Sequence, residues 1–94
     1  MRLTDPEIET ALAELNADWR CDGTALHLRV SRRDFASALA LVNQVAEAAE
    51  AQNHHPDVGL GWGWCSFRLT THSDGGLTAK DLKLARSIDA IIAS

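Results

Sequence analysis

Three of the four histidines in this chain have a spacing that suits acid/base chemistry. His54 and His55 are adjacent, and His72 follows after a stretch of alternating residues. An imidazole, whose ordinary pKa is about 6.5, can give or take a proton near neutral pH. Glu50 precedes His54 by four residues, or one helical turn, so its carboxylate can accept a hydrogen bond from that ring. The pattern predicts a base with an orienting acid beside it.

The same histidines allow two other interpretations. Exposed histidines are often polar surface residues without a further role, and three converging imidazoles would suit zinc, copper or iron. The fourth histidine, His27, stands apart from the others in the sequence. Gly59, Gly61 and Gly63 alternate along an expected strand and no helix begins after them, so they do not predict a phosphate-binding loop. The catalytic, metal-binding and purely structural interpretations stay open at this point.

Composition bounds the class of protein. The chain has 94 residues with 46% hydrophobic residues, which is enough for one core, and we expect a single domain over residues 1–94. Nine Lys and Arg stand against 13 Asp and Glu, for a formal net charge of -4. Nucleic-acid binding depends on neutralising phosphates, so direct binding to nucleic acid is disfavoured.

Apolar runs and cysteines indicate the compartment. No apolar run approaches the ~20 residues of a membrane helix, and the first residues lack the apolar segment of a signal peptide. Cys21 and Cys65 are far apart and have no metal-type spacing. We expect both to be reduced and structural, in a cytoplasmic protein with no membrane partner.

Three segments begin with Ser or Thr followed three residues later by an acid, a pattern that satisfies the free N–H groups of a helix start. They begin at Thr4, Ser31 and Thr78. The first predicted helix ends near Asn16. The second runs to about Asn53, because a proline two residues after His54 disfavours helical angles. The third closes the chain.

Two hairpins are expected between these helices. The first pairs residues 19–21 with 26–30 around the turn Asp22-Gly23, and the second pairs 58–62 with 65–71 around Gly63-Trp64. Strands joined by tight turns pair antiparallel, and three amphipathic helices cover one face of such a sheet. The predicted fold is therefore α+β: a two-layer sandwich with a four-stranded antiparallel sheet from two hairpins and three helices on one face, in the order α-β-β-α-β-β-α.

A longer pattern resembles a known family. Glu50 and His54-His55-Pro56, followed by Trp62, His72 and Asp81, resemble the signature of the pterin-4a-carbinolamine dehydratase family in residue types and spacing. The resemblance extends from Trp19 to the helix entry Gly76-Leu77-Thr78, nearly the whole chain. The fold of the family, paired hairpins with helices on one face, agrees with the predicted architecture.

The resemblance implies dehydration of 4a-hydroxytetrahydropterin to quinonoid dihydropterin, which supports pterin recycling after aromatic amino acid hydroxylation. It implies no metal and no organic cofactor. His54 and His72 resemble the general acid/base pair that acts at the two faces of the ring. His55 corresponds to the residue that binds and orients the pterin, and Glu50 to the support of His54.

Two further residues are implied at the substrate site. Trp19 would line the pocket, where an aromatic plane can stack on a flat heterocycle. Asp81 falls among the substrate-binding residues, although its place in the last helix start already explains it as a cap. The sequence departs from the family at its glycine-rich strand, and it carries Trp62 where similar proteins often have tyrosine.

Assembly and a second role complete the expectations. The strand 59–62 has none of the lysines or prolines that protect a sheet edge, so we expect a homodimer or tetramer formed through the second hairpin or the long helix. Trp64→Lys is the change expected to weaken it. The rival interpretation is a non-catalytic interaction module, because relatives in this family also act as dimerisation partners of transcription regulators.

Overall fold

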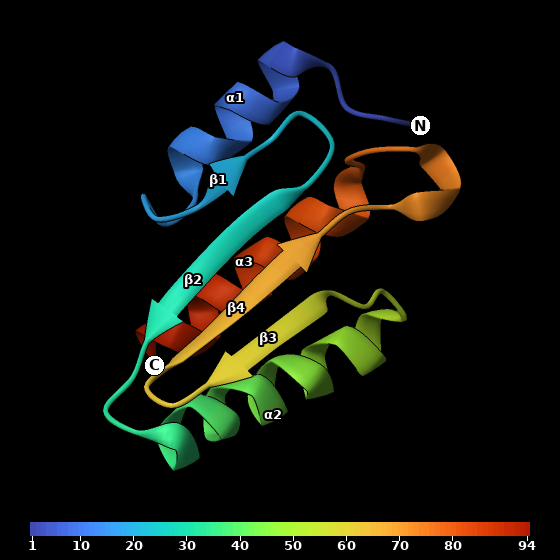
Figure 1. The fold of residues 1–94 in the computed structure, drawn as a ribbon. Coiled ribbons are helices and arrows are strands. Elements are labelled where there is room, and N and C mark those ends of the chain that lie inside the picture. The colour runs from blue at the N-terminus through green and yellow to red at the C-terminus, as the bar shows by residue number, and fades with distance from the viewer.

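The computed structural model describes residues 1–94 and contains three α-helices, four strands and one short 3-10 helix (Figure 1). Their order is α1 (Asp5–Glu14), β1 (Arg20–Cys21), β2 (Leu26–Ser31), α2 (Phe35–Gln52), β3 (Asp57–Gly61), β4 (Trp64–Leu69), η1 (His72–Asp74) and α3 (Ala79–Ala93). The predicted order of helices and strands is confirmed. No helix combines the length and the apolar character needed to cross a membrane.

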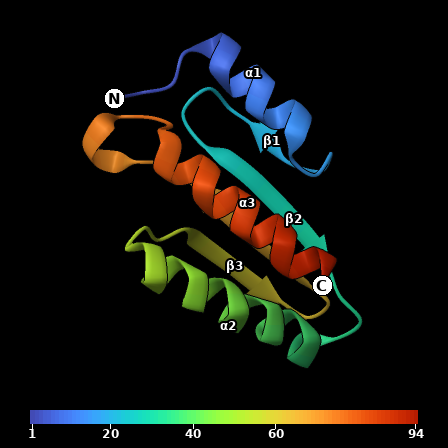
Figure 2. The same cartoon turned by 180° about the vertical axis from the view of Figure 1, so that it is seen from behind.

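The four strands form one antiparallel sheet in the order β1-β2-β4-β3. Its central pair, β2 and β4, comes from different hairpins and runs in register from Leu26 opposite Leu69 to Ser31 opposite Trp64. From behind, α3 lies across the sheet and α2 runs along β3 (Figure 2). The segment after β4, which carries His72, thus leads directly from the centre of the sheet to the start of α3.

One face of the sheet forms the core. The buried face of the central pair consists of Leu26, Leu28 and Val30 from β2 and Cys65, Phe67 and Leu69 from β4. A single cluster of 18 buried residues joins this face to all three helices. Desolvation in this core raises the pKa of the Cys65 thiol above its ordinary value. The opposite face keeps polar side chains such as Arg29 and Ser66, so the expected two-layer arrangement is confirmed.

Two of the three predicted helix starts are confirmed. Thr4 and Thr78 each form a capping box with the acid three residues later. The start expected at Ser31 is wrong, because Ser31 is the last residue of β2 and pairs with Trp64. Asp34 caps α2 instead, and its Oδ1 accepts a hydrogen bond of 2.8 Å from the backbone N–H of Ser37. Ser31 is held in the strand by its pairing, and the acid of the same pattern, Asp34, is the N-cap residue of the helix.

The second hairpin turns one residue earlier than expected. The turn is Trp62-Gly63, with Gly63 at φ 81°, and Trp64 is already in β4 opposite Gly61. The Trp64 ring lies over the backbone of β3: a Cβ at Gly61 would lie 2.5 Å from its Cε2, and one at Gly59 would lie 3.1 Å from its Cζ3. The Arg29 guanidinium stacks 4.4 Å from the ring centroid. Gly61 therefore makes room for Trp64, and Gly59 for both Trp64 and the Ser66 hydroxyl.

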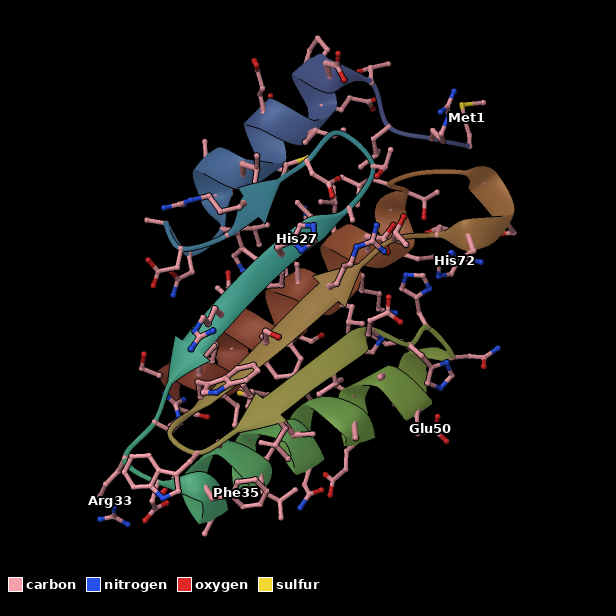
Figure 3. The ribbon with its side chains drawn as sticks, in the orientation of Figure 1. Met1, His27, Arg33, Phe35, Glu50 and His72 are labelled. Carbon is pink, nitrogen blue, oxygen red and sulfur yellow. The ribbon has the colours of Figure 1, made fainter.

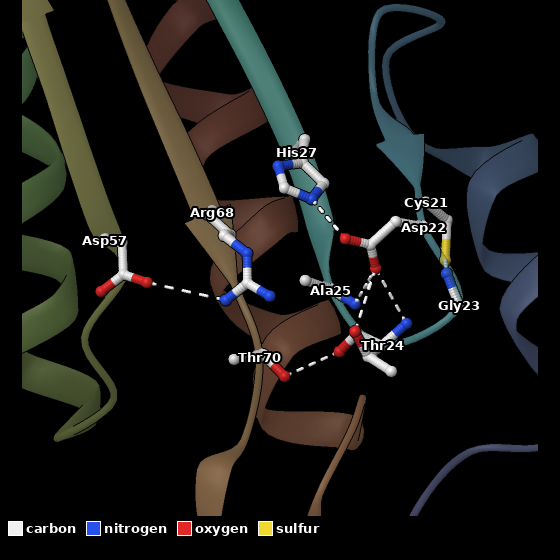
Figure 4. Close-up of polar contacts among 9 residues, drawn as sticks. All are labelled: Cys21, Asp22, Gly23, Thr24, Ala25, His27, Asp57, Arg68 and Thr70. Carbon is white, nitrogen blue, oxygen red and sulfur yellow. Dashed lines mark hydrogen bonds and ion pairs between the residues drawn. The ribbon is translucent and has the colours of Figure 1, made fainter.

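The first hairpin pairs β1 with β2 as expected, and the loop of residues 22–25 connects the two strands (Figure 4). Asp22 organises it: its carboxylate accepts hydrogen bonds from the N–H groups of Thr24 and Ala25 and lies 2.9 Å from Nε2 of His27. The bond to His27, followed by those from the backbone, holds the pKa of the Asp22 carboxyl well below its usual range. The Thr70 hydroxyl ties the loop to β4 by donating to the carbonyl of Thr24 at 2.7 Å. His27 is thereby explained as a structural residue.

Candidate active site

His54 is placed by the way α2 ends. The C-cap Asn53 adopts the left-handed conformation, with φ 49° and ψ 43°, and its N–H bonds back to the last turn of the helix. Such a cap reverses the direction of the chain. The N–H of His54 also donates to the carbonyl of Ala49, at 3.1 Å. The imidazole therefore leaves the helix axis and points toward the first turn of α3, with only 11% of its side chain exposed.

Asp81, in that first turn, forms a hydrogen bond with the imidazole of His54. Nε2 of His54 lies 2.5 Å from Oδ1 of Asp81, a residue with no exposed surface. Oδ2 of the same carboxylate accepts a hydrogen bond of 2.9 Å from the N–H of Thr78 and one of 2.7 Å from the hydroxyl of Thr71. A carboxylate only accepts, so the proton of a neutral His54 sits on Nε2. Its Nδ1 is left free to act as an acceptor.

This geometry changes the role expected for Asp81. The capping function is confirmed, but a residue with 0% exposure cannot contact a bound substrate. Asp81 instead orients His54, in the way that metal-binding and catalytic histidines are commonly fixed by a carboxylate. The capping pattern gave a signal for the bond between Thr78 and Asp81. The contribution of Thr71 had no sequence signal, because ten residues separate it from Asp81.

Glu50 supports a different histidine from the one expected. Its Oε2 pairs with Nε2 of His55, while His54 pairs with Asp81. The one-turn spacing between Glu50 and His54 applies only within a continuous helix, and the left-handed Asn53 interrupts it. The Glu50 and His55 side chains are 75% and 55% exposed. Solvent therefore screens this pair far more than the buried one.

His72 lies just beyond β4, as expected, and begins the short 3-10 helix η1. Thr71 and Gly76 pair through their backbones on either side of it and close the turn. The His72 side chain is exposed, and no ion pair or hydrogen bond within the chain holds its imidazole. Figure 3 shows His72 and Glu50 on the same side of the molecule, where β4 and α2 end.

Trp19 occupies a different environment from the one expected. Only 4% of it is exposed, and its indole N–H donates to Asp89 at 2.8 Å. Asp89 lies eight residues beyond Asp81, or about 12 Å along α3. The indole thus packs in the core, and its plane is covered. The stacking role expected for it has no support from this geometry.

The sequence allowed a metal site formed by His54, His55 and His72, and the structure does not bring such a site together. No group of three or more His, Cys, Asp or Glu side chains has the arrangement that could hold a metal ion. His54 and His55 instead turn their Nε2 atoms toward separate carboxylates, those of Asp81 and Glu50. The chain therefore presents one largely buried imidazole, that of His54, oriented by Asp81, and two exposed imidazoles, those of His55 and His72.

Comparisons with known proteins show which family the chain belongs to. The family described as pterin 4 alpha carbinolamine dehydratase matches residues 1–91. A protein of Nocardia farcinica with a provisional pterin-4-alpha-carbinolamine dehydratase name is 47% identical over 89 residues, covering 95% of this chain and 93% of that protein. A protein of Mycolicibacterium vanbaalenii with the same provisional name is 46% identical over 90 residues and covers 96% of each chain.

Two solved structures are also similar. The crystal structure of a transcriptional coactivator/pterin dehydratase from Brucella melitensis has a TM-score of 0.89 and 35% identity, and covers 97% of this chain and 98% of that one. A pterin dehydratase-like protein, described as a RuBisCO assembly factor in the alpha-carboxysome, has a TM-score of 0.66 and covers 81% of this chain and 88% of that one. At 19% identity, this second likeness shows the fold alone. The family match and the similar proteins together show that the chain belongs to the pterin-4a-carbinolamine dehydratase family.

Proposed function

We propose that this protein dehydrates 4a-hydroxytetrahydropterin to quinonoid dihydropterin by histidine acid/base catalysis. In this reaction the C4a–O bond breaks and the hydroxyl group takes a proton to leave as water. A proton is lost from the neighbouring ring nitrogen, and a C=N double bond forms. No electron is gained or lost, so two groups that can exchange protons are sufficient. The observation that carries the proposal is the buried contact between His54 and Asp81.

His54 is the better candidate for the base. Its Nδ1 is the free acceptor, and Asp81 both fixes the ring and stabilises the imidazolium that forms when Nδ1 takes a proton. His72 is the better candidate for the acid, because its exposed imidazole can carry a proton to the departing hydroxyl. The pterin would then lie between these two histidines, with one at each face of its ring.

His55 and Glu50 form the binding part of the proposed site. Their ion pair is exposed, so it can reach a substrate that approaches from solvent. The other nitrogen of His55, Nδ1, stays available for a hydrogen bond to the pterin. Glu50 keeps this ring in place, and we assign to it an effect on substrate binding. The proposal does not depend on a metal ion or an organic cofactor.

The test is the loss of carbinolamine absorbance with and without the protein. His54→Ala and His72→Ala should each lower kcat, because a positioned proton donor or acceptor is worth ~100- to 10,000-fold. The double variant should lose less than the product of the two single losses, since the two residues act together. His55→Ala and Glu50→Gln should mainly raise KM.

His27→Ala is the matched control, because Asp22 holds this histidine in the first hairpin. It should keep the turnover of the unchanged protein. Circular dichroism and urea unfolding of each variant separate lost chemistry from lost folding. Full turnover by the folded double variant at positions 54 and 72 would refute the assigned roles.

A role as an interaction module is the second candidate. Its specific support is exposed apolar surface: Trp62 is 73% exposed and Phe35 is 45% exposed. Aromatic residues are enriched at protein–protein interfaces relative to the rest of the surface. The absorbance assay separates the two candidates, because an interaction module would leave the uncatalysed rate of dehydration unchanged.

A further inference from the structure

Thr71 lies at the junction between the two histidines to which acid/base roles are assigned. Its hydroxyl donates to Oδ2 of Asp81 at 2.7 Å, and Asp81 holds the His54 ring on its other oxygen. Along the chain, Thr71 immediately precedes His72. The residue is only 5% exposed, so its hydroxyl cannot be satisfied by bulk water.

The hydroxyl groups around Asp81 have a defined direction. Thr71 has one hydroxyl proton, which it donates in the hydrogen bond to the Asp81 carboxylate. Thr71 must therefore accept the hydrogen bond from the Thr78 hydroxyl at 2.8 Å. Oδ2 of Asp81 thus accepts two hydrogen bonds, one from the Thr71 hydroxyl and one from the N–H of Thr78. Those two donors fix the plane of the carboxylate, and that plane fixes the orientation of the His54 imidazole.

The backbone of Thr71 has a second role. Its N–H donates to the carbonyl of Gly76 at 3.0 Å, and the N–H of Gly76 donates back at 3.4 Å. This pair closes the turn that contains His72, whose imidazole makes no hydrogen bond or ion pair within the chain. A shift of Thr71 would therefore move the base and the acid together.

We infer that Thr71 is a positioning residue that couples His54, through Asp81, to the turn that carries His72. This inference rests on the proposed function, because it concerns the same pair of histidines. Thr71 is buried and contacts no substrate. It acts on His54 through the hydroxyl bond to Asp81 and on the turn of His72 through the backbone pair with Gly76.

The experiment removes the hydroxyl and keeps the shape. Thr71→Val replaces the hydroxyl by a methyl group, and Thr71→Ser retains the hydroxyl without the methyl group. Thr70→Val is the control, since it removes the hydroxyl of the neighbouring threonine, which donates to the carbonyl of Thr24 and not to Asp81. Thr71→Ala provides a second variant without the hydroxyl if the valine variant does not fold.

Two measurements decide the outcome. In the absorbance assay, Thr71→Val should lower kcat by about 10-fold with KM within about twofold, and Thr71→Ser should restore most of kcat. In ¹⁵N NMR of the His54 ring without substrate, Thr71→Val should replace the single Nε2–H tautomer by a mixture, whereas Thr70→Val should not.

A folded Thr71→Val protein with unchanged kcat, or with an unchanged His54 spectrum, would overturn the inference. A serine variant that stays as slow as the valine variant would also overturn it, because the hydroxyl would then not be the group that matters. If the unchanged protein does not dehydrate the carbinolamine, the proposed function fails. The NMR comparison would still decide whether Thr71 positions His54.

Discussion

The most direct test of the packing in the second hairpin is Gly61→Ala. An alanine Cβ at this position would lie 2.5 Å from Cε2 and 2.9 Å from Cζ2 of Trp64. Carbon atoms in favourable contact are about 3.5 to 4.0 Å apart, so the indole must move by about 1 Å or more. The other contact of the ring, with Arg29 at 4.4 Å from the ring centroid, would be disturbed by the same movement.

The expected magnitude has two parts of opposite sign. Adding a methyl group to a packed site costs about 1–3 kcal/mol of folding stability, and disturbing an exposed cation–π contact costs about 0.5–1 kcal/mol. Where space is free, replacing a glycine in a strand by alanine gains roughly 0.5–1 kcal/mol. Gly61→Ala should therefore destabilise the unchanged protein but stabilise a Trp64→Ala variant.

A double-mutant cycle measured by urea unfolding checks this reversal. We expect a coupling free energy of about 1.5 kcal/mol or more between Gly61 and Trp64. Trp62→Ala is the matched control, because this neighbouring tryptophan is 73% exposed in the turn. Gly61→Ala should be as destabilising in that background as in the unchanged protein. An equal cost in the Trp64→Ala background would refute the packing explanation for the glycines.

Two further predictions concern acid stability and assembly. The pKa of Asp22 is lower in the folded protein than in the unfolded chain, so its carboxylate stabilises the fold above the unfolded pKa, near pH 4. This stabilisation is lost as the pH falls below that value. The urea midpoints of the unchanged protein and Asp22→Asn should therefore differ more at about pH 6 than at about pH 2.5. We also propose that the chain is at least a dimer through its exposed apolar side chains. Light scattering should give a mass of at least twice 10.2 kDa, and Trp62→Lys should lower this mass more than Ala36→Lys does. A monomeric unchanged protein would contradict the proposal.

The assembly prediction shows how structure corrects a choice made from the sequence. Trp62 and Trp64 are both tryptophans beside glycines in an unprotected strand, and the sequence did not distinguish their environments when Trp64→Lys was chosen as the disruptive change. The turn at Trp62-Gly63 leaves Trp62 in solvent, while Trp64 packs on the β3 backbone of its own chain. The turn lies one residue earlier than expected, and turn positions are difficult to predict where glycines alternate. Trp64→Lys should now act on folding, and Trp62→Lys on assembly.

Local patterns predicted the elements well because the same residues that form a pattern also form the contact. The capping boxes at Thr4 and Thr78 and the alternation in β2 and β4 are of this kind. The strand order β1-β2-β4-β3 did not follow from the sequence, because the two hairpins can meet along different edges. The cap of α2 was misassigned because two candidate caps, Ser31 and Asp34, compete, and strand pairing with Trp64 decides between them.

The histidine partners show the same limit at the site itself. Glu50 and His54 have helical spacing, but spacing predicts a contact only if the helix continues through both residues. A single left-handed residue, Asn53, ends α2 between them, and Glu50 pairs with His55 instead. His54 then finds Asp81, which is 27 residues away in the sequence and buried in another helix. The residues proposed for the site could therefore be named from the sequence, whereas the pairing on which their proposed roles rest depends on the end of one helix.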